Sequence, residues 1–559
     1  MKVLFVNPAR EGFFLITERQ VPLGIYYLMD SCKKAGFEVE LIDMLIGKIL
    51  PQTIPFERLS SEQKKRISFN PIFNDYVRLG IADEEVIKKI EQYRPSVVCI
   101  SIMFSCFHDS AERLAQTIKK RFPHIVIVAG GAHITTNYKE VLRNGVIDYC
   151  LRYEGEKTLP TLLKLIECKM PVDCVDGVAY GQNPVVINDD HTWINDLDSI
   201  NPAYDIISPE NYNRTITIIT SRGCPFACEF CTVHLSMGRR YRVRSVQNVI
   251  DELRIYARKG FKRFNIEDDN FTFDIDRAKA ICKGIIEQKI NCDIYLLNGI
   301  AAKSLDEECI SLMAAAGVKK LFLGLETTSD KLLSTLKKEH TSLQLIKAMV
   351  RLCNSYGINA GASLIIGFPS QTLEDILIDI TTLINSDIPI YAFNALYPLP
   401  GTEIYTECIK QGLLTGNEDF IFLGSDNFVI HNNSFSSEDL YYLWVCIKGY
   451  SKWGIMNAKY HTLDSLGVDE ALLLIADFLG GRVNNSTLEV PTCNVNAELM
   501  SGHYKVFVDM TKSFLYLLSG SWFDCDVMEE DNVVIKYTSS KSQIPVALVK
   551  LKDKLLEKR

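Results

Sequence analysis

Three cysteines stand close together near the middle of the chain, and no fourth cysteine accompanies them. The segment SRGCPFACEFCT, residues 221–232, places them at Cys224, Cys228 and Cys231 with the spacing C-x3-C-x2-C. A structural zinc site takes four protein ligands, commonly from two close pairs, but this chain has no second C-x-x-C. A ferredoxin-like cluster also takes four cysteines, in a C-x2-C-x2-C run that differs from this one. Three thiolates around a cluster of four irons would leave one iron open to a substrate.

The composition excludes several classes of protein. With 559 residues, 47% of them hydrophobic and 23% charged, the chain is expected to fold into several domains. The net charge of -8 gives no general attraction for nucleic acid or an anionic membrane. The cysteines lie mostly singly in apolar segments, which indicates reduced thiols. The N-terminus predicts a strand instead of a signal peptide, and the apolar runs are shorter than the roughly 20 residues of a membrane span, so we expect a cytoplasmic protein.

Short apolar runs alternate with amphipathic stretches in the first part of the chain. The predicted strands are residues 2–8, 39–45, 96–103, 125–131 and 148–153. Strands that alternate with helices form a parallel, doubly wound sheet, which binds its ligand at the carboxyl ends of the strands. The candidate ligand loops are residues 7–12, 101–105, 130–133 and 154–156. No G-x-G-x-x-G follows the first strand, so we expect a ligand larger and flatter than a dinucleotide.

The alternation begins again near residue 214. The predicted strands are residues 215–220, 262–268, 293–299, 319–326, 362–368 and 390–398. Six such units predict a (βα)6 partial TIM barrel, with its chemistry at the carboxyl ends of the strands. The three-cysteine segment follows the first of these strands, where an active-site loop belongs.

The expected fold class is α/β, in four parts. These are a Rossmann-like domain (1–174), a connector with a hairpin (175–210), the partial barrel (211–405) and a C-terminal accessory α+β domain (406–559). Residues 46–90 are expected to be an insertion that is helical near its end. In the C-terminal part, the runs KVFVDMTK and NVVIKYT predict strands.

The three-cysteine segment, placed after the first strand of a partial barrel, resembles the signature of the radical S-adenosylmethionine superfamily. The resemblance implies that Cys224, Cys228 and Cys231 hold a 4Fe-4S cluster whose open iron chelates S-adenosylmethionine. An electron from the cluster would then cleave S-adenosylmethionine to methionine and a 5′-deoxyadenosyl radical. A radical is needed because an unactivated C–H bond has no acidic proton for a general base to remove.

The same resemblance implies further contacts within the barrel. Phe230 would lie beside the adenine, and the expected contacts with cofactor or substrate are Asp268, Asp269, Glu326 and Ile365. The three carboxylates could instead cap helices or be solvated, and the isoleucine could pack in the core.

The N-terminal domain resembles the cobalamin-binding domain that precedes the barrel in cobalamin-dependent radical S-adenosylmethionine enzymes. The similar segments are VPLG, VVCISIMFS, VIVAGGAH and RYEGEKT. The cofactor-binding residues that this implies are Asn7, Pro22, Gly24, Ser101, Ser105, Gly130, Gly131, His133, Glu154, Gly155 and Glu156. The motif D-x-H-x-x-G, which supplies a histidine to cobalt in many cobalamin proteins, is absent from this domain, as is normal in this branch.

The resemblance implies a cobalamin-dependent radical methyltransferase that acts on an unactivated carbon of a small molecule. With the same cofactors, the reaction could also be cyclisation, oxidation or ring rearrangement. A non-catalytic redox sensor and a tRNA methylthiotransferase remain open as well. The methylthiotransferases carry a further three-cysteine domain, whereas Cys32, Cys99, Cys106 and Cys150 are scattered here. We expect a one-electron donor such as flavodoxin or ferredoxin and no nucleic acid partner, and the sequence assigns no catalytic acid or base.

Overall fold

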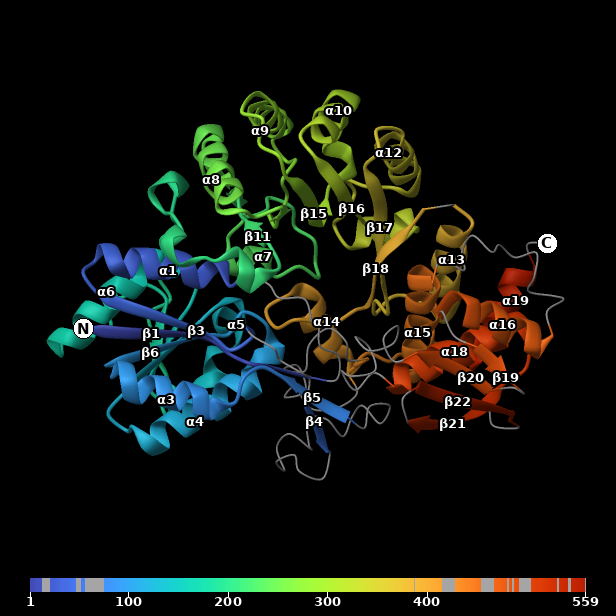
Figure 1. Ribbon diagram of the computed structural model, residues 1–559, viewed down its shortest axis with the longest axis horizontal. Helices are drawn as coiled ribbons and strands as arrows, with labels where there is room; N and C mark the ends of the chain where they lie inside the picture. Colours follow the sequence, from blue (N-terminus) through green and yellow to red (C-terminus); the bar gives the residue numbers. More distant parts are fainter. Residues whose placement is uncertain are drawn as a thin grey trace.

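The computed structural model contains two parallel sheet assemblies and a C-terminal α+β segment (Figure 1). It describes residues 1–12, 21–46, 52–55, 75–386, 388–414, 428–453, 467–479, 482–484, 487–491, 504–529, 532–540 and 544–557. The predicted α/β class is confirmed. None of the helices described is both long enough and apolar enough to cross a bilayer.

The N-terminal domain is built on a seven-stranded sheet in the order β10-β9-β8-β7-β6-β1-β3. The five predicted strands are all present and parallel: β1 (Lys2–Asn7), β3 (Glu38–Asp43), β6 (Val97–Ser101), β7 (Val126–Gly130) and β8 (Tyr149–Leu151). The order of the strands reverses between β1 and β6. In doubly wound sheets, the crevice outside the carboxyl ends of the strands at this reversal is the ligand site.

Helices cover both faces of this sheet, because successive side chains of a strand point to opposite sides. Val3 and Phe5 of β1 pack in one core with α1 (Leu23–Lys34) and α6 (Gly155–Cys168). Leu4 and Val6 pack in a second core with the remaining helices of the domain, which are α3 (Asp83–Tyr93), α4 (His108–Arg121) and α5 (Ala132–Leu142). The near-continuous apolar sequence of β1 therefore reflects burial on both faces.

Two smaller features complete the domain. The expected insertion contributes β4 (Gln52–Pro55) and β5 (Asp75–Leu79), which pair with β2 (Arg10–Gly12) in a separate antiparallel sheet. The rest of the insertion before β5, residues 47–51 and 56–74, lies outside the described residues. The expected hairpin is β9 (Val178–Tyr180) and β10 (Val186–Ile187), and it pairs antiparallel with β8, so the N-terminal sheet continues into the connector.

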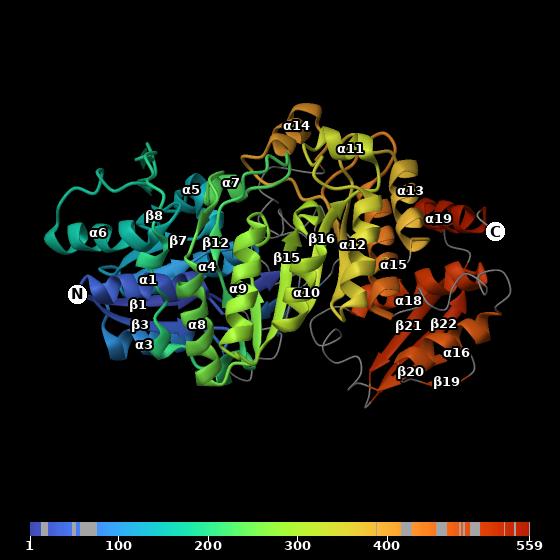
Figure 2. The ribbon, with the colours of Figure 1, turned by 90° about the horizontal axis from the view of Figure 1, so that it is seen from above.

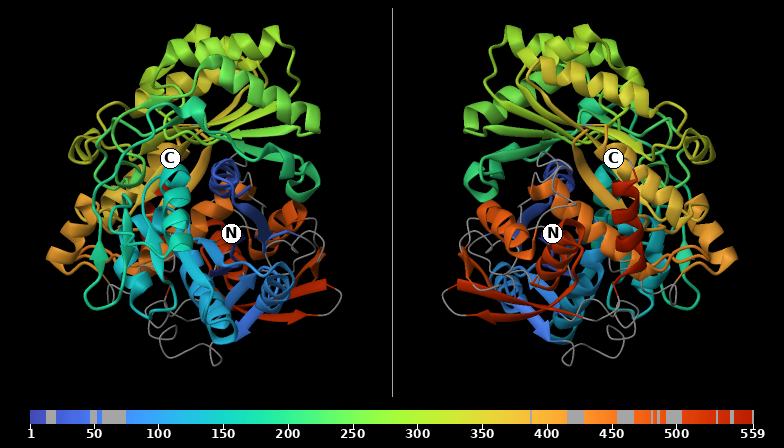
Figure 3. Two further views of the ribbon diagram at one scale, coloured as in Figure 1. Left: turned by 90° about the vertical axis from the view of Figure 1, so that its left-hand side faces the viewer. Right: turned by 90° about the vertical axis from the view of Figure 1, so that its right-hand side faces the viewer.

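The second assembly is a curved sheet of six parallel strands, as predicted (Figure 3). In spatial order these are β11 (Thr215–Ile218), β14 (Arg263–Ile266), β15 (Asp293–Ile300), β16 (Val318–Glu326), β17 (Asn359–Ile366) and β18 (Ile390–Ala395). The long outer helices are α8 (Val246–Lys259), α9 (Ile275–Glu287), α10 (Glu307–Ala315), α12 (Leu343–Ser355) and α13 (Leu373–Ile384). Each of these five helices begins after a Ser, Thr or Asp whose side chain accepts a hydrogen bond from a backbone N–H of the first turn.

Short elements surround the carboxyl ends of the barrel strands. The strands β12 (Ser221–Arg222) and β13 (Arg242–Val243) form a two-stranded antiparallel ribbon. The short helices are α7 (Val233–Ser236), α11 (Asp330–Thr335) and α14 (Glu403–Gln411).

The C-terminal segment covers one open edge of the partial barrel. An uncovered edge strand exposes unpaired backbone groups, and α15 (Ser437–Trp453) contacts the edge strand β18. The other helices are α16 (Val468–Leu479), α18 (Tyr504–Ser519) and α19 (Val546–Leu556). A four-stranded antiparallel sheet contains β19 (Arg482–Asn484), β20 (Thr487–Pro491), β21 (Phe523–Glu529) and β22 (Asn532–Ser539).

One strand prediction in this segment is wrong and one is confirmed. NVVIKYT lies in β22, but KVFVDMTK lies in the helix α18. A short apolar run does not distinguish a strand from a buried helix, and here the run continues for the 16 residues of α18, which is longer than an ordinary strand.

Candidate active site at the mouth of the barrel

The three cysteines lie on the loop that leaves β11, between the ribbon strand β12 and the helix α7. All three thiols are half-buried. Burial raises the pKa of Cys224 to about 11 and also raises the pKa of Cys228 and Cys231. Because a metal binds thiolates, loading of the site must release protons.

The spacing of the sulfur atoms indicates the kind of metal that this loop fits. Sulfur ligands of one tetrahedral zinc ion lie about 4 Å apart, since each Zn–S bond is about 2.3 Å long. Within the described part of the chain, the three cysteine Sγ atoms do not all lie within 4.8 Å of one another. The wider spacing and the all-thiolate donor set fit a cluster of several irons better than a single ion.

Two carboxylates after β14 hold the start of the cysteine loop. Asp268 is buried and accepts hydrogen bonds from the Thr220 backbone N–H (2.6 Å), the Thr220 hydroxyl (2.5 Å) and the Ser221 hydroxyl (2.5 Å). Asp269 accepts a hydrogen bond of 2.9 Å from the backbone N–H of Gly223. Both residues were expected to contact the cofactor, and the structure shows them orienting the loop that carries the cysteines.

Gly223 is required where the loop turns away from the ribbon. Its φ is +85°, and a Cβ atom at this position would lie 2.5 Å from the carbonyl oxygen of Arg240. A left-handed backbone and so close an approach together admit only glycine without a shift of the backbone.

Two of the predicted barrel residues, Glu326 and Phe230, lie beside a buried lysine, and a third, Ile365, lies on the neighbouring strand β17. Glu326 ends β16 with a φ of +70° and accepts hydrogen bonds from Lys338 Nζ (2.7 Å) and the Ser363 hydroxyl (2.8 Å). Phe230 lies with its ring 5.7 Å from Lys338 Nζ. Ile365 shares a face of β17 with Ser363, because residues two apart in a strand point the same way. The left-handed backbone of Glu326 is of the strained kind that clusters at functional sites.

Lys338 is a candidate functional residue that the sequence did not reveal. Its side chain is only 10% exposed, and its charge opposes the rise in the pKa of Cys228 and Cys231. Burial lowers the pKa of Lys338, but the Glu326 carboxylate raises it by more. The pKa is therefore above its ordinary value, and the ammonium stays charged beside the cysteine loop. In the sequence it is one of several charges in the run KKEH, without a motif of its own.

The residues predicted to bind cobalamin lie near the carboxyl ends of the N-terminal strands and differ in their exposure. Asn7 is buried and donates a hydrogen bond of 2.8 Å to Asp43. Ser101 is half-buried at the end of β6, Pro22 precedes α1, and Gly24 is exposed in the first turn of that helix. The structure therefore leaves Gly24 accessible, whereas the amide of Asn7 is engaged within the protein.

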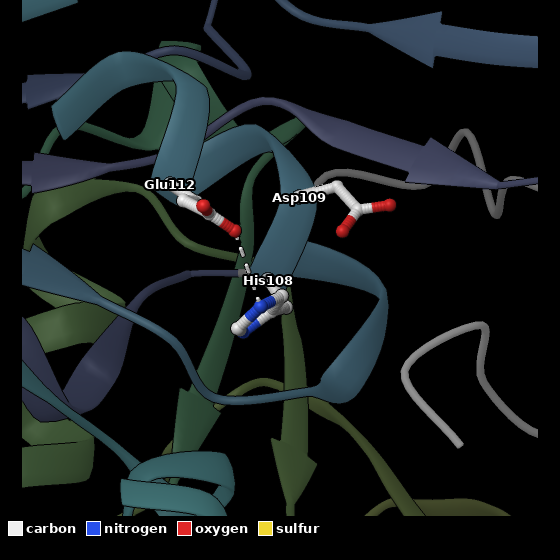
Figure 4. Close-up of side chains that lie close together, drawn as sticks. All are labelled: His108, Asp109 and Glu112. Carbon is white, nitrogen blue, oxygen red and sulfur yellow. Dashed lines mark ion pairs between the residues drawn. The ribbon is translucent and has the colours of Figure 1, made fainter. Parts of the chain in front are cut away.

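His133 belongs to a buried chain of polar side chains. It lies in the first turn of α5, with Nδ1 3.1 Å from the Ser105 hydroxyl and Nε2 3.2 Å from Nδ1 of His108. His108 in turn lies 3.5 Å from the Glu112 carboxylate, and Figure 4 shows these two side chains facing one another, with a carboxylate oxygen of Asp109 within 4.8 Å of both. Both ring nitrogens of His133 thus lie within hydrogen-bond distance of protein groups.

Exposed apolar side chains and glycines follow the carboxyl ends of β6 and β7. Met103 and Phe104, which follow β6, are 37% and 54% exposed. Gly130 ends β7, and Gly131 has a φ of +121° where the chain enters α5. Exposed apolar side chains that lie together often mark a surface that a ligand covers, and a corrin ring would do so here.

Glu154 and Glu156 face the barrel. Glu154 precedes α6 and accepts hydrogen bonds from Arg222 and Arg242, while Glu156 accepts one from Arg222. Gly155 starts α6 against Leu28, whose side chain would be 2.9 Å from a Cβ atom at this position. These two carboxylates were expected to contact cobalamin, and the structure shows them in ion pairs with the ribbon that flanks the cysteines.

The two halves of the site therefore face one another. The N-terminal helix α5 contacts α7, the short helix after Cys231, and Figure 2 shows them side by side next to β12. A sheet domain whose ligand crevice opens toward a three-cysteine loop at the mouth of a parallel barrel defines a class of radical enzymes with two metal cofactors.

Comparison with known proteins identifies the family. The chain matches the radical SAM superfamily at residues 218–383 and the B12 binding domain at residues 74–163. An uncharacterised methyltransferase of Pyrococcus horikoshii is 30% identical over 424 residues, which are 74% of this chain and 84% of that protein. An anaerobic magnesium-protoporphyrin IX monomethyl ester cyclase of Rubrivivax gelatinosus is 30% identical over 323 residues, 54% of this chain and 56% of that protein.

A solved structure has the same fold. The cobalamin-dependent S-adenosylmethionine radical enzyme OxsB, with aqua-cobalamin and S-adenosylmethionine bound, gives a TM-score of 0.62 at 17% identity, covering 92% of this chain and 72% of that chain. The chain belongs to the cobalamin-dependent radical S-adenosylmethionine enzymes. Its cofactors are accordingly a 4Fe-4S cluster, S-adenosylmethionine and cobalamin.

Proposed function

We propose that the protein is a C-methyltransferase that acts on an unactivated carbon of a small molecule. The observation that carries this proposal is the placement of the cobalamin-domain crevice against the cysteine loop, joined by the ion pairs of Glu154 and Glu156 with Arg222. When bound, the cluster and S-adenosylmethionine supply a hydrogen-abstracting radical, and cobalamin supplies a methyl group. The relative named as a methyltransferase, which is matched over 84% of its length, supports this outcome.

The residues of this chain have four tasks in that reaction. Cys224, Cys228 and Cys231 bind the cluster and leave one iron for S-adenosylmethionine. Glu326 engages one of the three N–H groups of the Lys338 ammonium. The others can donate to the carboxylate of S-adenosylmethionine. Phe230 and Ile365 line the adenosine side, and the crevice with exposed Met103 and Phe104 holds the corrin.

The proposal is tested by anaerobic turnover of the reconstituted protein with cobalamin, S-adenosylmethionine and a one-electron donor such as flavodoxin. Methylation predicts equal amounts of 5′-deoxyadenosine and S-adenosylhomocysteine, because one molecule of S-adenosylmethionine makes the radical and another supplies the methyl group. Candidate small molecules are screened by mass spectrometry for a gain of one CH2 unit. Formation of 5′-deoxyadenosine with substrate conversion but without S-adenosylhomocysteine would contradict methylation.

The second candidate function is an oxidative cyclisation with the same cofactors. The relative named as a cyclase, 30% identical over 323 residues, favours it. A product that is unmethylated and lighter by two hydrogens would establish this candidate in place of the first.

A methylthiotransferase activity has less support in the structure. Cys32, Cys99 and Cys150 are buried in the core of the N-terminal domain, with exposed fractions of 0%, 7% and 0%. All three pack among apolar side chains of the core, so no loop presents them together to a second cluster.

Replacement of Lys338 by methionine should weaken both the fold and the use of S-adenosylmethionine. The variant leaves Glu326 buried without its cation. Removing one partner of a buried ion pair lowers the free energy of unfolding by about 3–5 kcal/mol. We expect a lower unfolding temperature and a higher apparent KM for S-adenosylmethionine in 5′-deoxyadenosine formation. Lys283, whose exposed side chain pairs with Glu308 in the same barrel, gives the control, because Lys283→Met breaks only an exposed ion pair and should leave the unfolding temperature nearly unchanged. An unchanged KM in Lys338→Met would remove this lysine from the site.

A further inference from the structure

Two arginines with like charge stand directly opposite one another at the start of the cysteine loop. In the ribbon, Arg222 of β12 pairs with Arg242 of β13. Both are buried, with exposed fractions of 7% and 4%. Like charges directly opposite on paired strands destabilise the pair, and a buried cation without an anion is more costly still. The ribbon therefore depends on the carboxylates that pair with it.

Those carboxylates come from the N-terminal domain. One oxygen of Glu154 accepts hydrogen bonds from Nη1 of Arg222 (2.8 Å) and from Nη1 of Arg242 (2.9 Å). The other oxygen accepts from Nη1 of Arg242 (2.7 Å) and from the backbone N–H of Ile194 (2.8 Å). Glu156 accepts a hydrogen bond of 2.5 Å from Nη2 of Arg222. Two anions of one domain thus neutralise two cations of the other.

The position of Glu154 within this group is central. It lies between the two guanidinium groups, and its own side chain is 2% exposed. Burial acts to raise its pKa, but the two arginines outweigh burial and lower it, so the carboxylate stays ionised. Among the described contacts, no other residue of the group bonds both arginines. Glu154 is therefore the residue that links the two strands of the ribbon through their side chains.

The ribbon passes this restraint directly to the cysteine loop. Arg222 is two residues before Cys224, and the intervening Gly223 is itself held by Asp269. The backbone between them turns under the carbonyl oxygen of Arg240, so it has little space in which to adjust. A change at Glu154 is therefore expected to move Cys224.

We propose that Glu154 is a positioning residue for the cluster, acting through Arg222 and Arg242, and that it is not a ligand-binding residue of the cobalamin crevice. The cobalamin domain would then form part of the support of the cluster. This inference depends on the assignment of the cluster to the three cysteines, and it is independent of whether the product is methylated or cyclised.

The test is Glu154→Gln in the full chain, a change that removes the charge and keeps the shape. We expect the bound cobalamin per chain to stay unchanged, while the electron paramagnetic resonance spectrum of the reduced cluster with S-adenosylmethionine shifts or broadens. The rate of 5′-deoxyadenosine formation should fall by roughly tenfold to a hundredfold, as misplaced reacting groups lose such factors. Glu154→Asp, which keeps the charge, should recover part of the wild-type spectrum and part of the rate of 5′-deoxyadenosine formation.

The control is Asp148→Asn. Asp148 directly precedes β8 in the same domain, outside the candidate ligand loops, and accepts hydrogen bonds from Lys119 Nζ (2.6 Å) and the backbone N–H of Ile127 (2.7 Å). It should change neither the cluster spectrum nor the rate. Loss of cobalamin from Glu154→Gln with an unaltered cluster spectrum would overturn the proposal and assign Glu154 to the corrin. Identical spectra and rates in Glu154→Gln and the wild type would also overturn it. If Glu154→Gln does not fold, the same comparison applies to Glu154→Asp, whose spectrum must then differ from that of the wild type.

Discussion

Cys228→Ala should abolish cluster assembly and the formation of 5′-deoxyadenosine while leaving cobalamin bound. The loop offers three thiols, so the loss of one leaves two ligands for a cluster that requires three. The sheet to which we assign cobalamin is separate from the barrel sheet, and one of its two faces packs in a core of its own. We expect iron and sulfide contents near zero and a corrinoid content equal to that of the wild type.

The control for this variant is Cys174→Ala, which removes an exposed cysteine outside the loop. It should keep the full iron and sulfide content. Anaerobic purification, an optical spectrum and extraction of corrinoid measure both cofactors in one sample. Continued production of 5′-deoxyadenosine by Cys228→Ala would refute the assignment of the site, and zinc without sulfide at these thiols in the wild type would refute the cluster.

Gly131→Ala should have the reciprocal effect: cobalamin is lost and the cluster is kept. At a φ of +121°, a Cβ atom would lie 2.5 Å from the carbonyl oxygen of Ile102 and 3.0 Å from the backbone nitrogen of Met103. The backbone conformation alone, with φ +121° and ψ 173°, costs about 1–3 kcal/mol for a residue with a side chain. The clash adds to this and pushes the loop after β6 away from the start of α5, which are the two walls of the crevice.

Gly36→Ala separates the clash from the backbone strain. Gly36 lies in the same domain with a φ of +92°, but a Cβ atom there meets nothing within 4 Å. It should lower the unfolding temperature slightly and retain cobalamin. Equilibrium dialysis against cobalamin distinguishes the two variants, and equal retention by both would show that the turn at Gly131 does not shape the crevice.

The sequence predicted the framework of the molecule because its strands are short, apolar and regularly spaced. All five parallel strands of the first sheet and all six of the barrel lie where the pattern placed them. The three cysteines were visible because their spacing is a local property of the chain. By contrast, KVFVDMTK was assigned to a strand, since its apolar residues alone do not distinguish a strand from the buried helix α18.

Side-chain partners could not be predicted, because they depend on residues far apart in the sequence. Glu154 follows a strand end in the N-terminal domain, which favoured a ligand contact, but its partners Arg222 and Arg242 are 68 and 88 residues away. Lys338 pairs with Glu326 across a loop and a short helix, and no motif marks it. Asp268, which was expected to contact cofactor or substrate, accepts a hydrogen bond from Thr220, 48 residues earlier in the chain.

The paired arginines of the ribbon limit how this protein can be divided or recombined. A barrel expressed alone would lose the carboxylates and the aromatic side chains of Tyr27 and Trp193 that pack on these arginines, so its ribbon and cysteine loop should be less ordered than in the full chain. Chimeras between members of the family should work only when both partners of these pairs come from one parent. The N-terminal domain and the barrel are therefore not expected to work as two separable units.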